Sequence, residues 1–416
     1  MRKSLSVILA LAVCLGAAVA AFASGIDNKT NWSAGYARTM NRNAVYDAPD
    51  AAMFNPAGVG MMEKGLYVGV NNQSLFPDYS HESAAAPYEA KNPTYFLPSV
   101  SVVYKRDKLG FYGAFYVPAG GGSLEYDDGI VDLNEDLFLD VFGPSADLFG
   151  VYYAGTAGAV FSFNEMISVS LGGRYVFAKQ TTKFETETTI AGLPPALAFL
   201  NGFNVVLDTE ATASGFGAII GLDLSPLSGL NIGMRYETVT KLEWEYMDVT
   251  GPFAGAQGIA EGDKFDRDLP AIFAIGVSYM VLPKLKVEGS FDYYFNKGAD
   301  WDGGEDGVDN GFAIGAAAEY GLSEKLKASA GFLYTKTGAD KDSLVHLNPA
   351  LNSLTVAGGA LYEFSEKFSA ELGVMKPFYT ADDGSSAVGS TAVELERVAL
   401  DHRARPAVQD LLTMDG

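Results

Sequence analysis

Cysteine is almost absent from this sequence: the only one among 416 residues is Cys14. It lies in an N-terminal stretch that opens with Arg2 and Lys3, continues as an apolar run and ends in the small residues of "AFAS" (21–24). Charged, apolar and small segments in this order are typical of a secretory signal peptide, so we expect residues 1–24 to be cleaved. A lipoprotein signal at Cys14 is the alternative, although the apolar run continues past it. Cleavage leaves a mature chain without cysteine, which excludes disulfide bonds in an exported protein.

Positive charge is also scarce. Lysine and arginine together number 29 against 51 aspartate and glutamate residues, which gives a formal net charge of -22. This excess of negative charge argues against binding to nucleic acid. No second apolar run approaches the length of the N-terminal one, which argues against a membrane-spanning helix in the mature chain.

Residues suited to catalysis or metal binding are few. The histidines, His81, His346 and His402, fall in predicted loops or in the C-terminal tail, and none is flanked by a persuasive catalytic serine or aspartate motif. A hydrolase needs a nucleophile beside a positioned base, and a metal site needs clustered ligands. The acidic stretch "DWDGGEDGVDN" (300–310) misses the ligand spacing of a calcium loop, so we interpret it as a solvated loop. We therefore expect no enzyme activity, no cofactor and no metal.

Glycine and aromatic residues, in contrast, are abundant. The chain has 47 Gly, 22 Tyr and 26 Phe, and only 19% of its residues are charged. In "KLKVEGSFDYYF" (284–295) apolar and polar residues alternate, which is the pattern of a β-strand with two unlike faces. In an exported chain without cysteine, this combination is typical of an all-β outer-membrane barrel, whose apolar faces meet lipid. An array of secreted β-sandwiches is the alternative.

Loop lengths separate the barrel from the sandwich. Short connections such as "NE" (164–165) and "SE" (365–366) alternate with long ones such as 118–147 and 180–207. Short turns at one end and long loops at the other are the pattern of an outer-membrane barrel, and a sandwich has no reason to follow it. The predicted strands number about 14 and cover 64–73, 96–104, 109–117, 148–163, 166–179, 208–224, 229–241, 269–280, 284–297, 310–321, 325–335, 351–364, 367–378 and 387–400.

The first residues of the mature chain do not alternate. They contain Asn55, Pro56 and Ala57, a turn that can neither continue a helix nor fill a central strand. They are too few for an independent domain, so we expect them to lie inside the barrel as a plug. The predicted domains are a signal peptide (1–24), a plug (25–63), a transmembrane antiparallel β-barrel (64–400) and an atypical C-terminal tail (401–416).

Three stretches resemble a known family. "AGYARTMNRNAVYDAPDAAMFNPAGVG" (34–60) resembles the N-terminal hatch of the FadL/TodX family of outer-membrane transporters, which carries an Asn-Pro-Ala turn ahead of a fourteen-stranded barrel. "LPSVSVVYKRDKLGFYGAFYVPAGGGSLEY" (97–126) resembles the second and third strands of that family. "LPAIFAIGVSYMVLPKLKVEGSFDYYFN" (269–296) extends the match. The resemblance covers residues 30–378.

The resemblance implies passive uptake of hydrophobic molecules, either long-chain fatty acids or aromatic hydrocarbons. The solute would collect in an extracellular groove, enter the lumen and leave sideways to the bilayer where the third strand is kinked. Asn55, Pro56 and Ala57 match the plug turn that gates the wall. The alternative is a turn with a structural role alone.

Two further parts of that route can be matched to residues. "PAGGG" matches the kink through Pro118, Gly120, Gly121 and Gly122, because proline and glycine interrupt regular strand pairing. The alternative is the start of a long loop. Two unusually apolar loop segments match the capture groove, because exposed apolar patches mark binding sites; the alternative is loops that pack on each other. The candidate groove residues are Leu137, Phe138, Leu139, Phe142, Leu197, Phe199, Leu200 and Phe203.

The expected partners follow from a barrel of this kind. They are the lipid bilayer and lipopolysaccharide of a bacterial outer membrane, the barrel-assembly machinery and a hydrophobic small molecule, and we expect a monomer. Barrels of this type usually finish on a strand that ends in an aromatic residue, whereas here the alternation fades after Ala399. Two other functions stay open: a surface-exposed structural or adhesive barrel, and a general porin.

Overall fold

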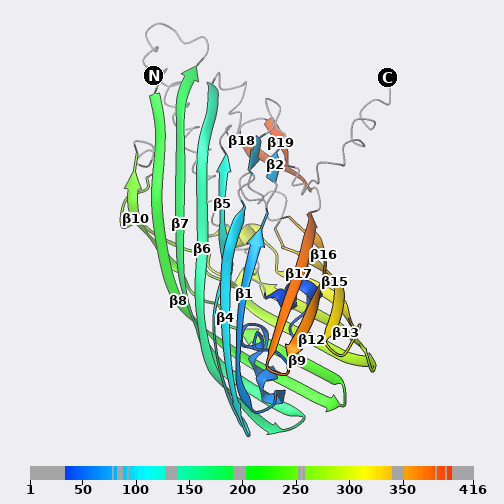
Figure 1. Ribbon diagram of the computed structural model, residues 1–416. Helices are drawn as coiled ribbons and strands as arrows, with labels where there is room; N and C mark the ends of the chain where they lie inside the picture. The colour runs from blue at the N-terminus through cyan, green and yellow to red at the C-terminus, as the bar shows by residue number, and fades with distance from the viewer. Residues whose placement is uncertain are drawn as a thin grey trace, which may run out of the picture.

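The structure of the protein, a computed structural model, describes most of the chain (Figure 1). The predicted signal peptide and the predicted C-terminal tail lie outside the described residues. In the described part, no helix is both long and apolar enough to cross a bilayer. The described residues are 33–76, 79–81, 88–90, 93–126, 139–190, 203–251, 254, 258–339, 351–379, 382–388 and 391–395.

A single fifteen-stranded sheet dominates the molecule, and all of its strand pairs are antiparallel. All strands except β10 (Glu243–Thr250) and β11 (Lys264–Asp266) follow one another along one path, and β10 pairs with both β8 and β11. The path runs through β1 (Gly65–Leu75), β4 (Thr94–Arg106), β5 (Leu109–Tyr126), β6 (Leu139–Asn164), β7 (Ile167–Ile190), β8 (Phe203–Leu227), β9 (Leu230–Glu237), β12 (Ala271–Leu282), β13 (Leu285–Phe295), β14 (Gly311–Gly321), β15 (Leu326–Lys336), β16 (Ser353–Ser365) and β17 (Phe368–Tyr379).

The two faces of the sheet have inverted polarity. On β4, the side chains of Val100, Val102 and Tyr104 are exposed on the outer face, whereas Ser99 and Ser101 are fully buried on the inner face. A soluble sheet buries its apolar face, so the order here is the reverse of what water favours. Apolar side chains outside and polar side chains inside are the pattern of a barrel wall.

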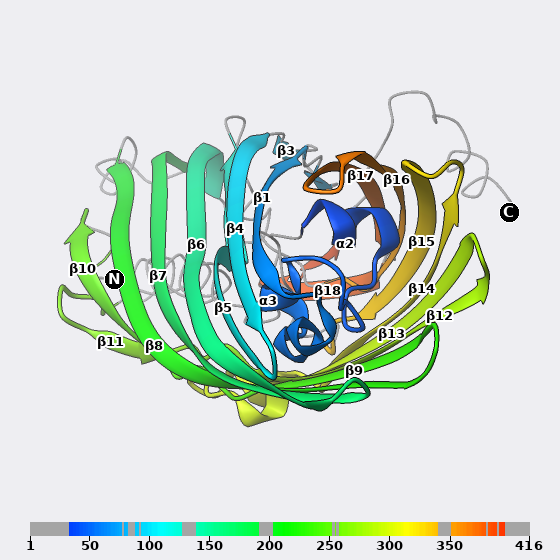
Figure 2. The same ribbon diagram turned by 60° about the horizontal axis from the view of Figure 1, so that its bottom comes forward.

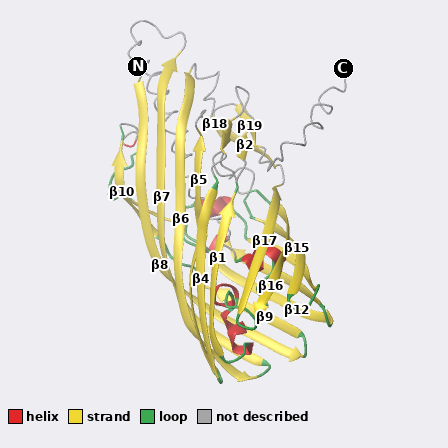
Figure 3. Cartoon of the chain, in the orientation of Figure 1, coloured by secondary structure: helices red, strands yellow, loops and turns green. Residues whose placement is uncertain are grey.

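The predicted strands from 64–73 to 367–378 each overlap one strand of this path, but β5, β6, β7 and β8 are longer than predicted by eight or more residues each. Strands β6, β7 and β8 have 26, 24 and 25 residues, whereas β13, β14 and β15 have 11 each. The wall is therefore much taller on the β6–β8 side (Figures 1 and 3). Much of the predicted loops 118–147 and 180–207 is strand, and these parts of the prediction were wrong.

Other predicted loops also contain strands. The predicted loop 242–268 contains β10 and β11, and a small hairpin of β2 (Tyr79–His81) and β3 (Tyr88–Ala90) lies within the predicted loop 74–95. Strands β2, β3 and β11 have only 3 residues each, and sequence alternation is weak evidence over so few residues.

The described residues of the closing strand predicted at 387–400 do not pair with the wall. Residues Thr391–Leu395 (β19) pair with Asp382–Val388 (β18) in a separate hairpin. Among the described strands, β1 and β17 are the two ends of the path. Because strand direction alternates along the path, these two edges run in the same direction. An antiparallel closure would therefore require a further strand between them.

The N-terminal residues lie within the curve of the sheet (Figure 2). They form α2 (Ala34–Thr39), α3 (Ala51–Phe54) and the 3-10 helix η1 (Pro56–Met61). Met40, Phe54 and Val59 of this segment are almost fully buried and belong to one hydrophobic cluster with inner-face residues of the wall. The core of the molecule is thus the contact between the N-terminal segment and the inner face of the sheet.

Candidate functional site

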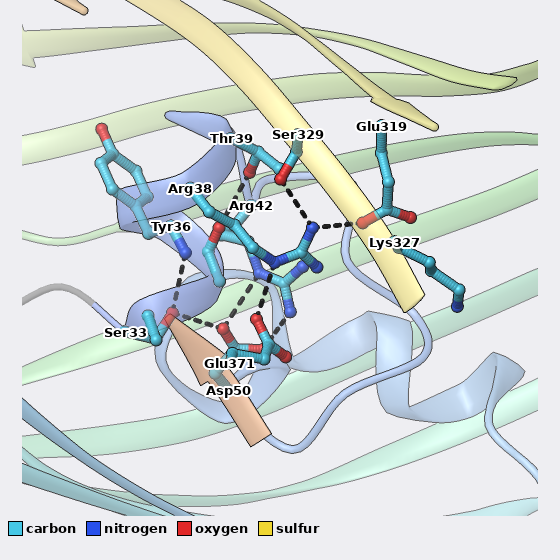
Figure 4. Close-up of polar contacts among 12 residues, drawn as sticks. Ser33, Tyr36, Arg38, Thr39, Arg42, Asp50, Glu319, Lys327, Ser329 and Glu371 are labelled. Atoms are coloured by element: carbon cyan, nitrogen blue, oxygen red, sulfur yellow. Dashed lines mark hydrogen bonds and ion pairs between the residues drawn. The ribbon is translucent and has the colours of Figure 1, made fainter. Parts of the chain in front are cut away.

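Arg38 of α2 joins the N-terminal segment to three strands of the wall (Figure 4). Its Nε donates to Oε2 of Glu371 on β17 at 2.9 Å, and Nη1 donates to Oγ of Ser329 on β15 at 3.0 Å. The same Nη1 also forms an ion pair with Glu319 on β14. The Arg38 side chain is only 3% exposed, so the guanidinium is buried among its partners. This contact fixes α2 across β14–β17.

Arg42 and Asp50 hold the N-terminal segment in its own fold. The guanidinium of Arg42 forms an ion pair with Asp50, in which Nε donates to Oδ2 at 3.0 Å. Ser33, the N-cap of α2, donates its hydroxyl to the same carboxylate at 2.5 Å and accepts from the Tyr36 amide (Figure 4). The start of α2 and the residue before α3 are therefore tied together.

Asn55, Pro56 and Ala57 anchor the segment to β7 and β8. Asn55 has the extended backbone expected before a proline, and Pro56 opens η1. The Asn55 side-chain amide donates to the Leu222 carbonyl at 3.3 Å and lies 3.4 Å from Oδ2 of Asp223. The Ala57 carbonyl accepts from a wall hydroxyl of β7 at 2.6 Å. All three residues are buried, and their gating role stays a prediction.

Glycines of the wall let the backbone of the segment approach closely. A Cβ on Gly373 would lie 2.7 Å from both the Ala34 carbonyl oxygen and the Arg38 amide nitrogen, which is too close for any side chain. The cross-strand partner of Gly373 is Gly359, which meets Cβ of Arg38 in the same way. This pair of glycines forms the surface on which α2 lies.

A buried ionic cluster of the wall lies against the C-terminal end of α3. Glu237 pairs with Arg174 and, at 3.0 Å, with Nε of Arg235, and all three side chains are at most 3% exposed. Arg235 also donates to the carbonyls of Met53 and Phe54, at 3.3 Å for Met53. These carbonyls end α3, so a wall arginine holds the C-terminal end of this helix. The sequence gives only a weak signal for this cluster. Alternation predicts that a charged residue lies on the inner face, but it does not predict which residue pairs with it.

The predicted kink lies on β5 and is strand rather than loop. Opposite β6, the register shifts between Tyr116 and Ala119 and again between Gly120 and Gly122. Gly120 and Gly121 have φ of 67° and 97°, which side chains disfavour. Each bulge adds one residue to β5 and bends it. Pro118 is buried between the two paired regions. The alternative in which "PAGGG" only begins a loop is therefore wrong.

The predicted gate and the predicted kink are far apart. The turn at Asn55 meets the wall beside Ser170, because both approach Gly221, and Ser170 pairs with Val160 of β6. Gly120 pairs with Val151 of β6, nine residues further along that strand. At about 3.3 Å per residue the separation along β6 is about 30 Å. The turn does not abut the kink.

The predicted capture groove is described only in part. Leu137, Phe138, Leu197, Phe199 and Leu200 lie outside the described residues. The other three candidates lie on strands and not in loops: Leu139 pairs with Ile190, Phe142 with Glu187 and Phe203 with Thr188.

The acidic loop gathers three carboxylates. Asp300 and Asp302 lie beside Asp266 of β11, with one carboxylate oxygen of each within 4.8 Å of the others. Burial, and then the charges of Asp300 and Asp302, raise the pKa of Asp266. Asp300 and Asp302 are exposed, which agrees with a solvated loop.

The comparisons with known proteins concern the fold. No model of a known protein family matches the sequence, and no curated protein matches it. The toluene transporter TbuX of Ralstonia pickettii matches with a TM-score of 0.60 at 16% identity, over 83% of this chain and 92% of TbuX. A FadL homologue of Pseudomonas aeruginosa gives 0.63 at 14% identity, over 89% and 96%. A mutant of the monoaromatic hydrocarbon channel TodX gives 0.64 at 14% identity, over 83% and 92%.

At these identities the likeness is one of fold. TbuX is described as a toluene transporter, and TodX as a monoaromatic hydrocarbon channel. The resemblance to this family inferred from the sequence is confirmed at the level of the fold. This chain therefore has the fold of the FadL/TodX-type transporters.

Proposed function

We propose that this chain is an outer-membrane channel for the passive uptake of hydrophobic molecules. Two features of the wall carry the proposal. Its outer face is apolar, and the space that it encloses is occupied by the chain's own N-terminal segment. Such a wall suits a bilayer. A filled interior does not suit a wide aqueous pore. The toluene transporter TbuX and the hydrocarbon channel TodX, which share the fold, support the same class of solute.

The outer face supports a position in the membrane. On β1 the side chains of Leu66, Val68 and Val70 are 67%, 60% and 74% exposed. On β7 the outward residues are apolar as far as Phe177, and Lys179 then begins a charged region. Residues 167–177 match the length of about 9–11 residues that a tilted strand needs to cross a bilayer. The upper parts of β6–β8 would then project beyond the membrane, toward lipopolysaccharide.

The N-terminal segment suits the role of a plug, formed by residues 25–63. Arg38, Asn55 and Arg235 connect it to opposite parts of the wall. A general porin needs an open bore, so this segment argues against that alternative. A structural or adhesive barrel is the alternative, and it predicts no flux of any solute. We further propose a monomer that is inserted by the barrel-assembly machinery after cleavage of the signal peptide.

A lateral exit suits the chemistry of the solute. An apolar molecule gains nothing from a water-filled outlet, because each buried CH₂ is worth about 0.8 kcal/mol in an apolar environment. The double bulge of β5 interrupts the regular ladder of the wall, and we place the exit there. Fatty acids and aromatic hydrocarbons are both compatible with an apolar exit of this kind.

Uptake by cells tests this function. In cells without channels of their own for these solutes, expression of the chain should raise the initial uptake of radiolabelled oleate or toluene severalfold. Uptake equal to that of cells without the chain, at normal levels of folded protein, would favour the adhesive alternative. A variant with Asn55→Ala and Pro56→Ala tests gating in the same assay, because loosening the turn should change the rate severalfold.

A further inference from the structure

The regular pairing of β4 with β5 stops partway along both strands. Its register runs from Arg106↔Leu109 to Val100↔Phe115. Above this point β4 continues to pair with β1, and β5 continues to pair with β6. The two bulges of β5 begin immediately after this point, and bulges bend a strand and disrupt its ladder. The β4–β5 ladder therefore ends at this level, while the ladders on either side of it continue.

Leu97 occupies this interruption. Its side chain is 4% exposed and forms a small hydrophobic cluster with Val117 of β5 and Val151 of β6. Cδ2 of Leu97 lies 2.6 Å from the point that a Cβ on Gly121 would occupy, and Cγ1 of Val117 lies 3.2 Å from it. The glycine thus makes the space that the leucine fills. Apolar side chains of the two strands are therefore in contact at this level.

The backbone around Leu97 is held from the β1 side. The Leu97 amide donates to Oδ1 of Asn72 at 3.1 Å, and Nδ2 of Asn72 donates to the Tyr95 carbonyl at 3.1 Å. The side chains of Tyr95 and Phe96 point outward and are largely exposed. The backbone around Leu97 is therefore held to β1, and the Leu97 side chain packs against Val117 of β5. A side chain on a fixed backbone can change rotamer without any strand moving.

We propose that Leu97 is a specificity-determining residue that closes the wall between β4 and β5 and sets the width of the apolar exit. The proposal rests on the proposed function and deepens it. It assigns the selection of solutes by width to a residue of the wall and not to the plug. The Asn55 turn meets the wall about 30 Å away along β6, so it is not positioned to act on this exit directly. The solute class is a flat or slender apolar molecule that passes when the Leu97 side chain turns aside.

Uptake of two aromatic probes of different width tests the proposal. In cells that express the full chain, Leu97→Ala should raise the ratio of pyrene uptake to naphthalene uptake by about fivefold or more, because shortening a side chain in an apolar passage favours the larger molecule. Leu97→Trp should lower uptake of both probes by about tenfold, because the larger side chain narrows the passage.

A second leucine-to-alanine substitution, at a buried position on another strand of the wall, serves as the matched control. Leu333 of β15 is also 4% exposed on the inner face, and Leu333→Ala should leave the uptake ratio unchanged. The heat-dependent gel shift of each variant reports whether it is folded. An unchanged ratio in folded Leu97→Ala protein at normal membrane levels overturns the proposal.

A chemical readout separates this proposal from the proposed function. Leu97→Cys should react with pyrenyl maleimide dissolved in the membrane, whereas Leu333→Cys should not, because only position 97 faces the exit. The sole natural cysteine, Cys14, lies in the predicted signal peptide and leaves the background clear. Absence of uptake by the native chain, together with labelling of Leu97→Cys, would refute the proposed function alone. Equal labelling at the two positions would refute the role of Leu97.

Discussion

Replacement of Glu237 by alanine should lower the free energy of unfolding by about 3–5 kcal/mol. The carboxylate lies between Arg174 and Arg235, and all three side chains are almost fully buried. Removing it leaves two buried guanidinium groups without the charge that offsets their loss of water. Equilibrium unfolding by denaturant in phospholipid vesicles would measure the change.

An exposed ion pair provides the control for this prediction. Lys183 and Asp208 form a pair at 3.1 Å, with side chains 58% and 42% exposed. Asp208→Asn should cost less than about 1 kcal/mol, because water screens exposed charges. Equal losses for Glu237→Ala and Asp208→Asn would contradict the account of the buried cluster.

Replacement of Gly373 by leucine should release α2 from the wall. The Cβ alone would lie 2.7 Å from backbone atoms of α2, and backbone cannot move aside as a flexible side chain can. Overpacking of this kind costs about 1–3 kcal/mol, so we expect tryptic cleavage after Arg38 and Arg42 to accelerate about fivefold or more. Both arginines are buried in the native protein, which protects them. Mass spectrometry of the peptides released by trypsin would measure the rate.

Gly155 is the matched glycine for this experiment. It lies on the exposed face of β6, and a Cβ there would meet nothing within 4 Å. Gly155→Leu should leave the cleavage rate unchanged. Tryptic resistance of folded Gly373→Leu protein would mean that α2 does not depend on close contact with this glycine pair.

The wall could be predicted from the sequence because apolar and polar residues still alternate along its strands. Only the side that the apolar residues face differs from that in a soluble sheet. Leu285, Val287 and Phe291 mark one face of a strand wherever that face points. The tall strands were underestimated for a physical reason. Beyond Phe177 the outward residues of β7 become charged, starting with Lys179, so the apolar signal ends although the strand continues.

The site could be predicted only where proline or glycine shows that the backbone has an unusual conformation. Proline and glycine identified the turn at Pro56 and the bulges at Gly120 and Gly121, because these residues restrict or free the backbone locally. Leu97 carries no such mark, since its role depends on the register between β4 and β5 and on the glycine opposite it. The partner of Arg174 lies 63 residues away in sequence, and a pairing over that distance follows from the fold alone.

The rate at which the purified protein admits an apolar and a polar solute into vesicles tests the central claim most directly. The vesicles should carry lipopolysaccharide in the outer leaflet, because this layer slows the entry of apolar molecules. The account predicts that naphthalene enters several times faster with the protein than without it, without any energy source, and that arabinose entry does not change. Faster arabinose entry, or naphthalene entry that the protein does not alter, would contradict it.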